Sequence, residues 1–255
     1  MNILSSDSHV EVGATHDLCE DYAVSSDRAI IVCDGCSSSP NTDFGAQVLA
    51  RACLRNIKMS ANTVESVKIA IECSIHAALA ASKVLDIPNT CLDATIVAGV
   101  PIGEEFHFFL VGDGVLAWKY KDAEKPQFLI VDYVNNAPEY LSYGLDVHRR
   151  EKYLAEFGNE RIVKGNNGIV DVLNGQIIAT FCPLSSEGLE WVAVFTDGVS
   201  SFQGVETQEV LSHLTAFKNF KGKFLKRRAK RYLNTQGLRH DDDVSCAAMS
   251  FSTGE

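Results

Sequence analysis

The sequence lacks the features that would assign it to a membrane, secreted or fibrous class. Its 255 residues contain no run of eighteen apolar residues, so no membrane-spanning helix is expected. The opening residues MNILSSDSHVE have neither the basic stretch nor the apolar core of a secretory leader. No internal repeat or low-complexity tract is present. With 46% hydrophobic residues the chain can bury a full core, and we expect one cytoplasmic domain over residues 1–255.

Cysteine is not arranged as in a disulfide framework or a zinc site. Most cysteines lie inside apolar runs, as small buried residues do in a reducing cytoplasm, at positions 19, 33, 36, 53, 73, 91, 182 and 246. Cys33 and Cys36 form a C-x-x-C pair, but a structural zinc site needs a second ligand pair at similar spacing. A thioredoxin-type pair opens a helix, whereas this one closes a strand. Zinc and redox chemistry stay open only as minor alternatives.

Positive charge is scarce outside one segment. The formal net charge of -10 argues against general nucleic-acid affinity. Residues 218–231, KNFKGKFLKRRAKR, carry eight Lys and Arg residues, so the charge of the rest of the chain is -18. Aromatic residues and leucine interleave with them, which predicts an amphipathic helix with a solvated basic face. The alternative is a docking site for an acidic phosphoprotein, and nucleic-acid binding is the least favoured interpretation.

Acidic residues recur where apolar runs end. Asp34, Asp113 and Asp197 each follow such a run and precede a glycine, and Asp241–Asp243 precede the last run, VSCAAMSF. Asp-Gly between apolar runs is a common hairpin turn, and we expect a hairpin at Asp113-Gly114 because VLAWKY continues as a strand. Asn-Gly would serve a turn equally well, yet none of these spots carries asparagine. This favours a metal site built from converging strand ends.

The acidic positions share one ligand chemistry. Carboxylate oxygens are hard ligands that select Mg²⁺ or Mn²⁺ over zinc, and the candidates are Glu20, Asp21, Asp34, Asp113, Asp197 and Asp242. Clustering so many acids without a cation costs repulsion and desolvation, so metals are close to obligatory if the acids meet. Two ions could hold a phosphoryl group and activate a water for phosphate-ester hydrolysis.

Hydrophobic periodicity predicts an α+β fold. Strands are expected at 1–12, 21–33, 92–100, 105–111, 115–120, 127–133, 177–181, 191–196 and 244–251, and helices from 42 or 43 to 57 and at 64–85, 149–157, 206–217 and 223–235. Short connections make the four strands from 92 to 133 an antiparallel meander. Segment 134–175 is expected to be an irregular insertion or a mobile flap beside the site. The order predicts two stacked antiparallel sheets flanked by helix pairs, a four-layer α-β-β-α sandwich.

The acidic blocks, in their order, resemble those of the metal-dependent serine/threonine phosphatases of the PP2C (PPM) type, nearly end to end. The blocks are CED at 19–21, VCDG at 32–35, DAT at 93–95, VGDG at 111–114, FTDG at 195–198 and DDVS at 242–245. Each is weak alone, but the joint order, with a helix pair in both expected places, is specific. GATH at 13–16 before CED is similar to a compact bacterial-type subgroup.

The resemblance implies hydrolysis of phosphoserine and phosphothreonine on proteins by direct attack of a metal-bridging hydroxide, without a phosphoenzyme intermediate. Asp34 would bridge two Mg²⁺ or Mn²⁺ ions, with the Gly35 carbonyl on one of them. Asp197 and Asp242 would hold the other ion.

The resemblance also implies supporting roles. Glu20 and Asp21 would act directly or through waters, and Asp113 would suit a third, weaker ion. By position, His16 takes over the duty of an arginine that binds the substrate phosphate in most other members, although a polar turn histidine is the alternative.

Three departures from the family pattern bear on the site. The GG that usually follows DG is absent, since the chain reads DGCSSS. Cys36 stands where some relatives place a histidine general acid, so the leaving group must be protonated by water or from elsewhere. DN has become DD, so the ligand assigned to Asp242 could instead be Asp241 or Asp243.

Two other functions compete with the phosphatase. One is a catalytically weak regulatory module that binds phosphoproteins and keeps the same fold; the other is a two-metal nuclease, suggested only by the basic segment. For the phosphatase we expect a monomer whose phosphoprotein substrates dock on residues 218–231, with no membrane partner.

Overall fold

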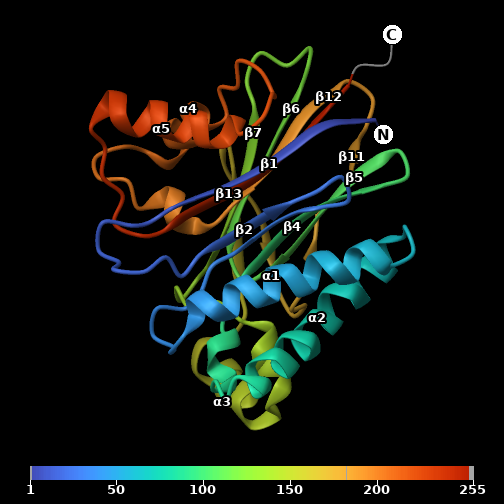
Figure 1. Cartoon of the computed structure of the whole chain (residues 1–255), viewed down its shortest axis with the longest axis vertical. Helices are drawn as coiled ribbons and strands as arrows, with labels where there is room; N and C mark the ends of the chain where they lie inside the picture. Colours follow the sequence, from blue (N-terminus) through green and yellow to red (C-terminus); the bar gives the residue numbers. More distant parts are fainter. Residues whose placement is uncertain (1, 182, 253–255) are drawn as a thin grey trace.

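Two antiparallel sheets stack face to face in the computed structural model, which describes residues 2–181 and 183–252 (Figure 1). Cys182 lies outside the described residues. The seven-stranded sheet has the order β1 (Ile3–Glu11), β13 (Val244–Phe251), β12 (Leu189–Phe195), β6 (Gly114–Tyr120), β7 (Gln127–Tyr133), β8 (Arg161–Gly165) and β9 (Gly168–Leu173). The six-stranded sheet has the order β10 (Ala179–Thr180), β5 (Glu105–Val111), β4 (Ile96–Ile102), β3 (Ile30–Cys33) and β2 (Tyr22–Ser25), with β11 (Leu184–Ser185) also on β5.

Helices cover both outer faces of this sandwich (Figure 1). The six-stranded sheet is covered by α1 (Thr42–Met59) and α2 (Val64–Val84), and the seven-stranded sheet by α4 (Thr207–Leu214) and α5 (Phe224–Gln236). The shorter α3 (Val147–Phe157) and the 3-10 turns η1 (Asn89–Leu92), η2 (Leu141–Leu145) and η3 (Asp197–Ser200) complete the fold. The predicted four-layer α-β-β-α sandwich is confirmed. Among the described helices, none has the length and apolar character needed to cross a bilayer.

Strand β3 shows why its sequence is apolar without a break. Ile30 and Val32 pack between the two sheets, whereas Ile31 and Cys33 pack under α1 and α2. A strand buried on both faces has no polar side to alternate with. Strand β3 is therefore fixed at the centre of the sandwich, and the next residue, Asp34, lies at the end of the sheets.

Two sequence predictions about strand pairing are wrong. Residues 21–33 are not one strand but the hairpin β2–β3, in which Ser25 pairs with Ile30. The strands from 92 to 133 are not one meander either, because β5 and β6 belong to different sheets. The turn at Asp113 therefore carries the chain from one sheet to the other instead of closing a hairpin. Gly112 and Gly114 flank it at φ of 84° and 139°, conformations that favour glycine.

Segment 134–175 is more regular than predicted. It contains η2 and α3, and β8 and β9 extend the seven-stranded sheet beyond β7. The Asp146 side chain accepts hydrogen bonds from His148 N and Arg149 N and so caps the start of α3. Most of this segment is therefore regular secondary structure, and its action as a mobile flap beside the site stays a prediction.

Candidate active site

Four aspartates from both sheets line one cavity of about 220 Å³ at the end of the sandwich. Asp34 follows β3, Asp113 lies in the turn that leaves β5, Asp197 follows β12 and Asp242 precedes β13. The sequence predicted this convergence of strand ends. The cavity is also lined by His16, Gly35, Cys36, Ser37, Thr95, Asn136, Pro138 and Tyr140.

Asp34 is held in place by its own backbone and by Thr95. Asp34 N donates to Thr95 Oγ1 at 3.1 Å, and Thr95 N donates to the Asp34 carbonyl at 2.8 Å. The next residue must be glycine, because a Cβ on Gly35 would lie 2.7 Å from the Glu20 carbonyl oxygen and 2.8 Å from Thr42 Cβ. Close backbone packing at Gly35 therefore aims the Asp34 carboxyl into the cavity.

Asp21 lies beside Asp34 in the interior. Thr196 Oγ1 donates to Asp21 Oδ2 at 2.7 Å, and the two carboxyl groups of Asp21 and Asp34 lie within hydrogen-bonding reach of each other. Burial raises the pKa of Asp34 well above its usual range, and the charges of Asp21 and Asp197 raise it further. Burial likewise raises the pKa of Asp21. Carboxyl groups this close disfavour a second negative charge, so they share protons or require a cation.

Asp113 and Asp197 also have raised pKa values. Burial raises the pKa of Asp113, and the charge of Asp197 adds to it. Burial also raises the pKa of Asp197. Asp197 Oδ1 is buried without a hydrogen-bond partner among the described residues. An unpaired buried acceptor costs about 1–3 kcal/mol, so this oxygen needs a donor or a cation.

The structure separates the roles of the three consecutive aspartates. Asp243 is buried and accepts from Gly13 N at 2.7 Å and from Glu20 N at 2.6 Å. Burial raises the pKa of Asp243, but these hydrogen bonds and His16 outweigh it and lower the pKa overall. Asp241 accepts from Gln203 Nε2 at the surface. Asp242 is the one of the three that lines the cavity.

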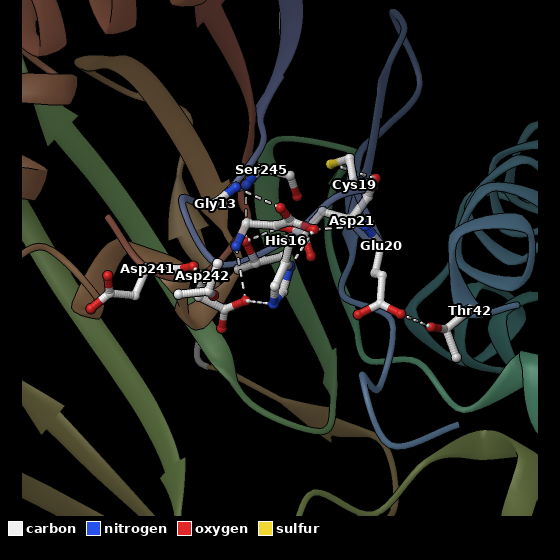
Figure 2. Close-up of polar contacts among 12 residues, drawn as sticks. Gly13, His16, Cys19, Glu20, Asp21, Thr42, Asp241, Asp242 and Ser245 are labelled. Atoms are coloured by element: carbon white, nitrogen blue, oxygen red, sulfur yellow. Dashed lines mark hydrogen bonds and ion pairs between the residues drawn. The ribbon is translucent and has the colours of Figure 1, made fainter. Parts of the chain in front are cut away.

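His16 and Glu20 contact different partners (Figure 2). His16 Nδ1 lies 3.1 Å from Asp243 Oδ2, and Nε2 lies 3.7 Å from Asp242 Oδ1. Burial lowers the pKa of His16, but the neighbouring carboxylates of Asp243, Asp242 and Glu20 raise it more, so the net shift is upward. Glu20 Oε1 instead accepts from Thr42 Oγ1 at 2.9 Å, at the start of α1. His16 therefore faces the cavity, whereas Glu20 joins its wall to the helix layer.

The sequence did not predict that segment 134–175 forms one wall of the cavity. Its anchor is the buried Asp93, which accepts from Ser39 Oγ at 2.7 Å, from Ser142 Oγ at 2.6 Å and from Arg149 Nη1 at 2.9 Å. Arg149 Nη2 reaches the second Asp93 oxygen, so this ion pair is bidentate. The partners lie 56 residues apart, and no local pattern marks them. Tyr140, which lines the cavity, is carried by this anchored segment.

The two cysteines of the C-x-x-C pair have different environments. Cys33 is buried under α1, where burial raises its pKa well above the usual range. Cys36 lines the cavity, and its Sγ lies 3.1 Å from Ser38 Oγ. Both are free thiols. The structure places one thiol in the helix core and the other in the cavity, which disfavours a redox or zinc pair.

The carboxyl groups of Asp34, Asp113, Asp197 and Asp242 share one cavity. Across residues 2–181 and 183–252, no three His, Cys, Asp or Glu side chains stand in a geometry that would already coordinate one ion. Asp34 lies near enough to Asp21 and Asp197 for their charges to raise its pKa. The donors are nevertheless all oxygens gathered at one cavity, as Mg²⁺ or Mn²⁺ requires.

Known proteins share this architecture. The family model described as Protein phosphatase 2C matches residues 7–238, a range that ends before Asp242. The serine/threonine phosphatase PstP/Ppp of Mycobacterium tuberculosis is similar, with a TM-score of 0.60 and 14% identity over 98% of this chain and 100% of that one. The catalytic domain of PstP in complex with two manganese ions has a TM-score of 0.57 and 13% identity over 98% and 99% of the two chains.

A third solved structure agrees with these. The serine/threonine phosphatase Stp1 of Staphylococcus aureus has a TM-score of 0.57 and 11% identity, over 99% of this chain and 98% of that one. No curated protein sequence matches the chain. At these identities the solved structures establish a shared fold.

Proposed function

Because the chain belongs to the protein phosphatase 2C family of serine/threonine phosphatases, we propose that it removes phosphate from phosphoserine and phosphothreonine residues of proteins. The observation that carries this proposal is the meeting of Asp34, Asp113, Asp197 and Asp242 in one cavity, at the strand ends where the resemblance expects them. The attacking group in this proposal is water, and no phosphoenzyme forms.

We propose that these acids hold Mg²⁺ or Mn²⁺. Asp34, the Gly35 carbonyl, Asp197 and Asp242 would hold two ions, and Asp113 would serve a third, weaker one. Two observations support the fit: the donor set is made of oxygens, and the buried Asp197 Oδ1 lacks a partner among the described residues. When bound, the ions would polarise the phosphoryl oxygens and lower the pKa of the attacking water.

Protons compete with the proposed ions for the carboxylate oxygens of this site. The pKa values of Asp21, Asp34 and Asp113 are all raised, with burial the largest cause, so protons and cations compete for the same oxygens. We therefore expect metal affinity to rise with pH.

Glu20 and Asp21 are proposed to stabilise the residues that line the cavity. Asp21, fixed by the Thr196 hydroxyl, lies within reach of Asp34 and limits where that carboxyl can move. Glu20 is fixed by Thr42 through its side chain and by Asp243 through its backbone N–H. Their expected action is on ions through water or on the ligands themselves.

His16 is the proposed contact for the substrate phosphate. It lines the cavity, and its raised pKa favours the protonated ring, which donates to phosphate oxygens. Asp242 and Asp243 hold the ring in place from two sides. Cys36 also lines the cavity but stands where a histidine general acid would, so water protonates the leaving group in this proposal.

A panel of phosphoserine, phosphothreonine and phosphotyrosine peptides, assayed for phosphate release with Mn²⁺ or with EDTA, tests the proposed function. We expect Mn²⁺-dependent release from the first two and little from the third. Phosphopeptide binding without any release would instead identify a phosphoprotein-binding regulatory module of the same fold. Release that persists in EDTA would contradict the metal assignment.

A further inference from the structure

A second cavity lies on the outer face of the seven-stranded sheet, where the loop after α4 meets α5. Its volume is about 440 Å³, and it is lined by Ala216, Phe217, Lys218, Asn219, Phe224, Arg227, Arg228, Lys230 and Arg231. We call it the basic pocket. Seven of these nine residues come from segment 218–231, which was predicted to form an amphipathic helix. The prediction is confirmed from Phe224 onward, where α5 begins: Phe224 and Leu225 are buried, while Lys226 and Arg227 are exposed.

The floor of the basic pocket is aromatic. Phe224 is buried, and its ring centroid lies 5.3 Å from that of Phe217 in an edge-on arrangement. Phe217 in turn packs edge-on against Trp191 of β12, also at 5.3 Å. A rigid aromatic floor of this kind favours one bulky apolar side chain from a partner.

The rim of the basic pocket is cationic and has no internal counter-charge. The ion pairs that Lys and Arg make within the described residues all lie elsewhere, at Lys119, Arg149, Arg150 and Lys164. Arg227 donates to the Asn219 side chain and Arg228 to the His213 carbonyl, both neutral acceptors. Burial and the neighbouring Arg231 lower the pKa of Arg228, so an anion here would relieve like-charge repulsion.

The basic pocket is separate from the active-site cavity. Phe217 contacts Trp191 near the start of β12, whereas Asp197 follows the end of that strand. Phe195 lies four positions after Trp191 along the strand, a span of about 13 Å. An occupant of the basic pocket therefore leaves the active-site cavity free for a phosphorylated side chain.

We propose that the basic pocket docks an acidic segment of the substrate protein, one that carries a bulky apolar side chain among its carboxylates. Charge complementarity supports this occupant, because the rim is cationic and the floor is aromatic. A long nucleic acid fits less well, since the chain outside residues 218–231 has a charge of -18 and would repel it. Only the statement that the docked partner is a substrate rests on the proposed function.

Binding of a fluorescent peptide with one leucine between two pairs of glutamates tests the docking site by anisotropy. Lys218→Glu with Lys230→Glu reverses two rim charges, and Lys221→Glu with Lys226→Glu makes the same charge change in the same exposed segment outside the pocket. We expect at least tenfold weaker binding for the rim pair and less than a threefold change for the control pair. Equal losses would show general electrostatic attraction and overturn the proposal.

The apolar part of the proposal has its own test. Ala216→Trp fills the pocket without changing charge and should weaken the leucine peptide about tenfold. A peptide with serine in place of the leucine should bind wild-type protein about tenfold more weakly. Equal binding of the two peptides, or tighter binding of single-stranded DNA of equal charge, would overturn an acidic-peptide site.

Activity measurements connect docking to turnover. With a phosphopeptide joined to the acidic segment through a long Gly-Ser linker, Lys218→Glu with Lys230→Glu should raise KM about tenfold. Turnover of p-nitrophenyl phosphate should stay unchanged, because that substrate has no acidic segment. If the wild-type protein releases no phosphate, the proposed function fails, and the anisotropy results still decide whether the pocket docks acidic peptides.

Discussion

Asp34→Asn should stabilise the protein without metal and destroy its activity with metal. Asp34 is partly buried, and its pKa is raised by desolvation and then by the charges of Asp21 and Asp197. In such a position the negative charge opposes folding at neutral pH, because the unfolded chain carries that charge in water at little cost. Asparagine keeps the size of the side chain and removes the charge. The same substitution deletes the proposed bridging ligand.

The expected magnitudes follow from the crowding of the acids. Removing one like charge from a buried carboxyl cluster should stabilise the metal-free fold by on the order of 1–3 kcal/mol. For a chain of this length, about 2–4 °C in Tm accompanies each kcal/mol. Conversely, Mn²⁺ at a hundredfold excess over Kd should stabilise the wild-type protein by about 2.7 kcal/mol. The Tm advantage of Asp34→Asn in EDTA should therefore shrink or reverse in Mn²⁺.

Thermal unfolding of wild type and Asp34→Asn in both conditions, with phosphate release measured in parallel, checks this. Asp241→Asn is the matched control, since Asp241 contacts Gln203 at the surface and should leave Tm and activity nearly unchanged. A lower Tm for Asp34→Asn in EDTA would refute the claim that the acids repel one another. An equal Mn²⁺-dependent rise in both proteins would exclude Asp34 as a ligand.

Three further substitutions test other parts of the structure. Cys36→Ala should keep turnover within about threefold, because water is the proposed nucleophile, and loss of activity in the folded variant would argue for a covalent thiol intermediate. Arg149→Met should destabilise the fold by about 3–5 kcal/mol in urea, since it leaves the buried Asp93 carboxylate without its cation. Burial raises the pKa of Asp7, so the neutral carboxyl stabilises the folded state at low pH, and this stability is lost as pH rises through that pKa. Asp7→Asn should therefore stabilise the fold by under about 1 kcal/mol at pH 8, which raises Tm, and should leave Tm unchanged at pH 3. A gain of equal size at both pH values would contradict this.

The parts of the site that local sequence could predict are those at strand ends. The unbroken apolar run before Asp34 and the run before Asp197 mark strands buried on both faces, and an acid directly after such a strand must emerge at the edge of the sandwich. Helix α2 was predictable for a similar reason, because Thr63 and Ser66 form a capping box just before its apolar positions. In each case the decisive interactions lie within a few residues.

Errors arose where the deciding interactions are long-range. The turn at Asp113 has the composition of a hairpin turn, and only the pairing of β6 with β12 shows that the chain changes sheets there. The choice among Asp241, Asp242 and Asp243 is equally invisible locally. It depends on Gly13 N and Glu20 N, which lie more than 200 residues away and occupy the Asp243 carboxylate. Strands β8 and β9 were both missed. In β9 exposed apolar side chains occur on both faces, as at Ile169 and Val170, so no alternation with polar residues marks the strand.

The aspartates also explain why this site needs two sheets. Asp34 is delivered by the six-stranded sheet, Asp197 and Asp242 by the seven-stranded sheet, and Asp113 by the turn that joins them. The separation of these carboxyls is therefore set by the packing between the sheets, where Val32, Leu116 and Val194 are buried together. Val194→Ala makes a cavity between the sheets and should change the distance between the acids, and with it the metal affinity. A cavity made under α5 should lower stability without changing metal affinity. If metal affinity fell in proportion to stability for substitutions in both places, the packing between the sheets would not be what sets the separation of the acids.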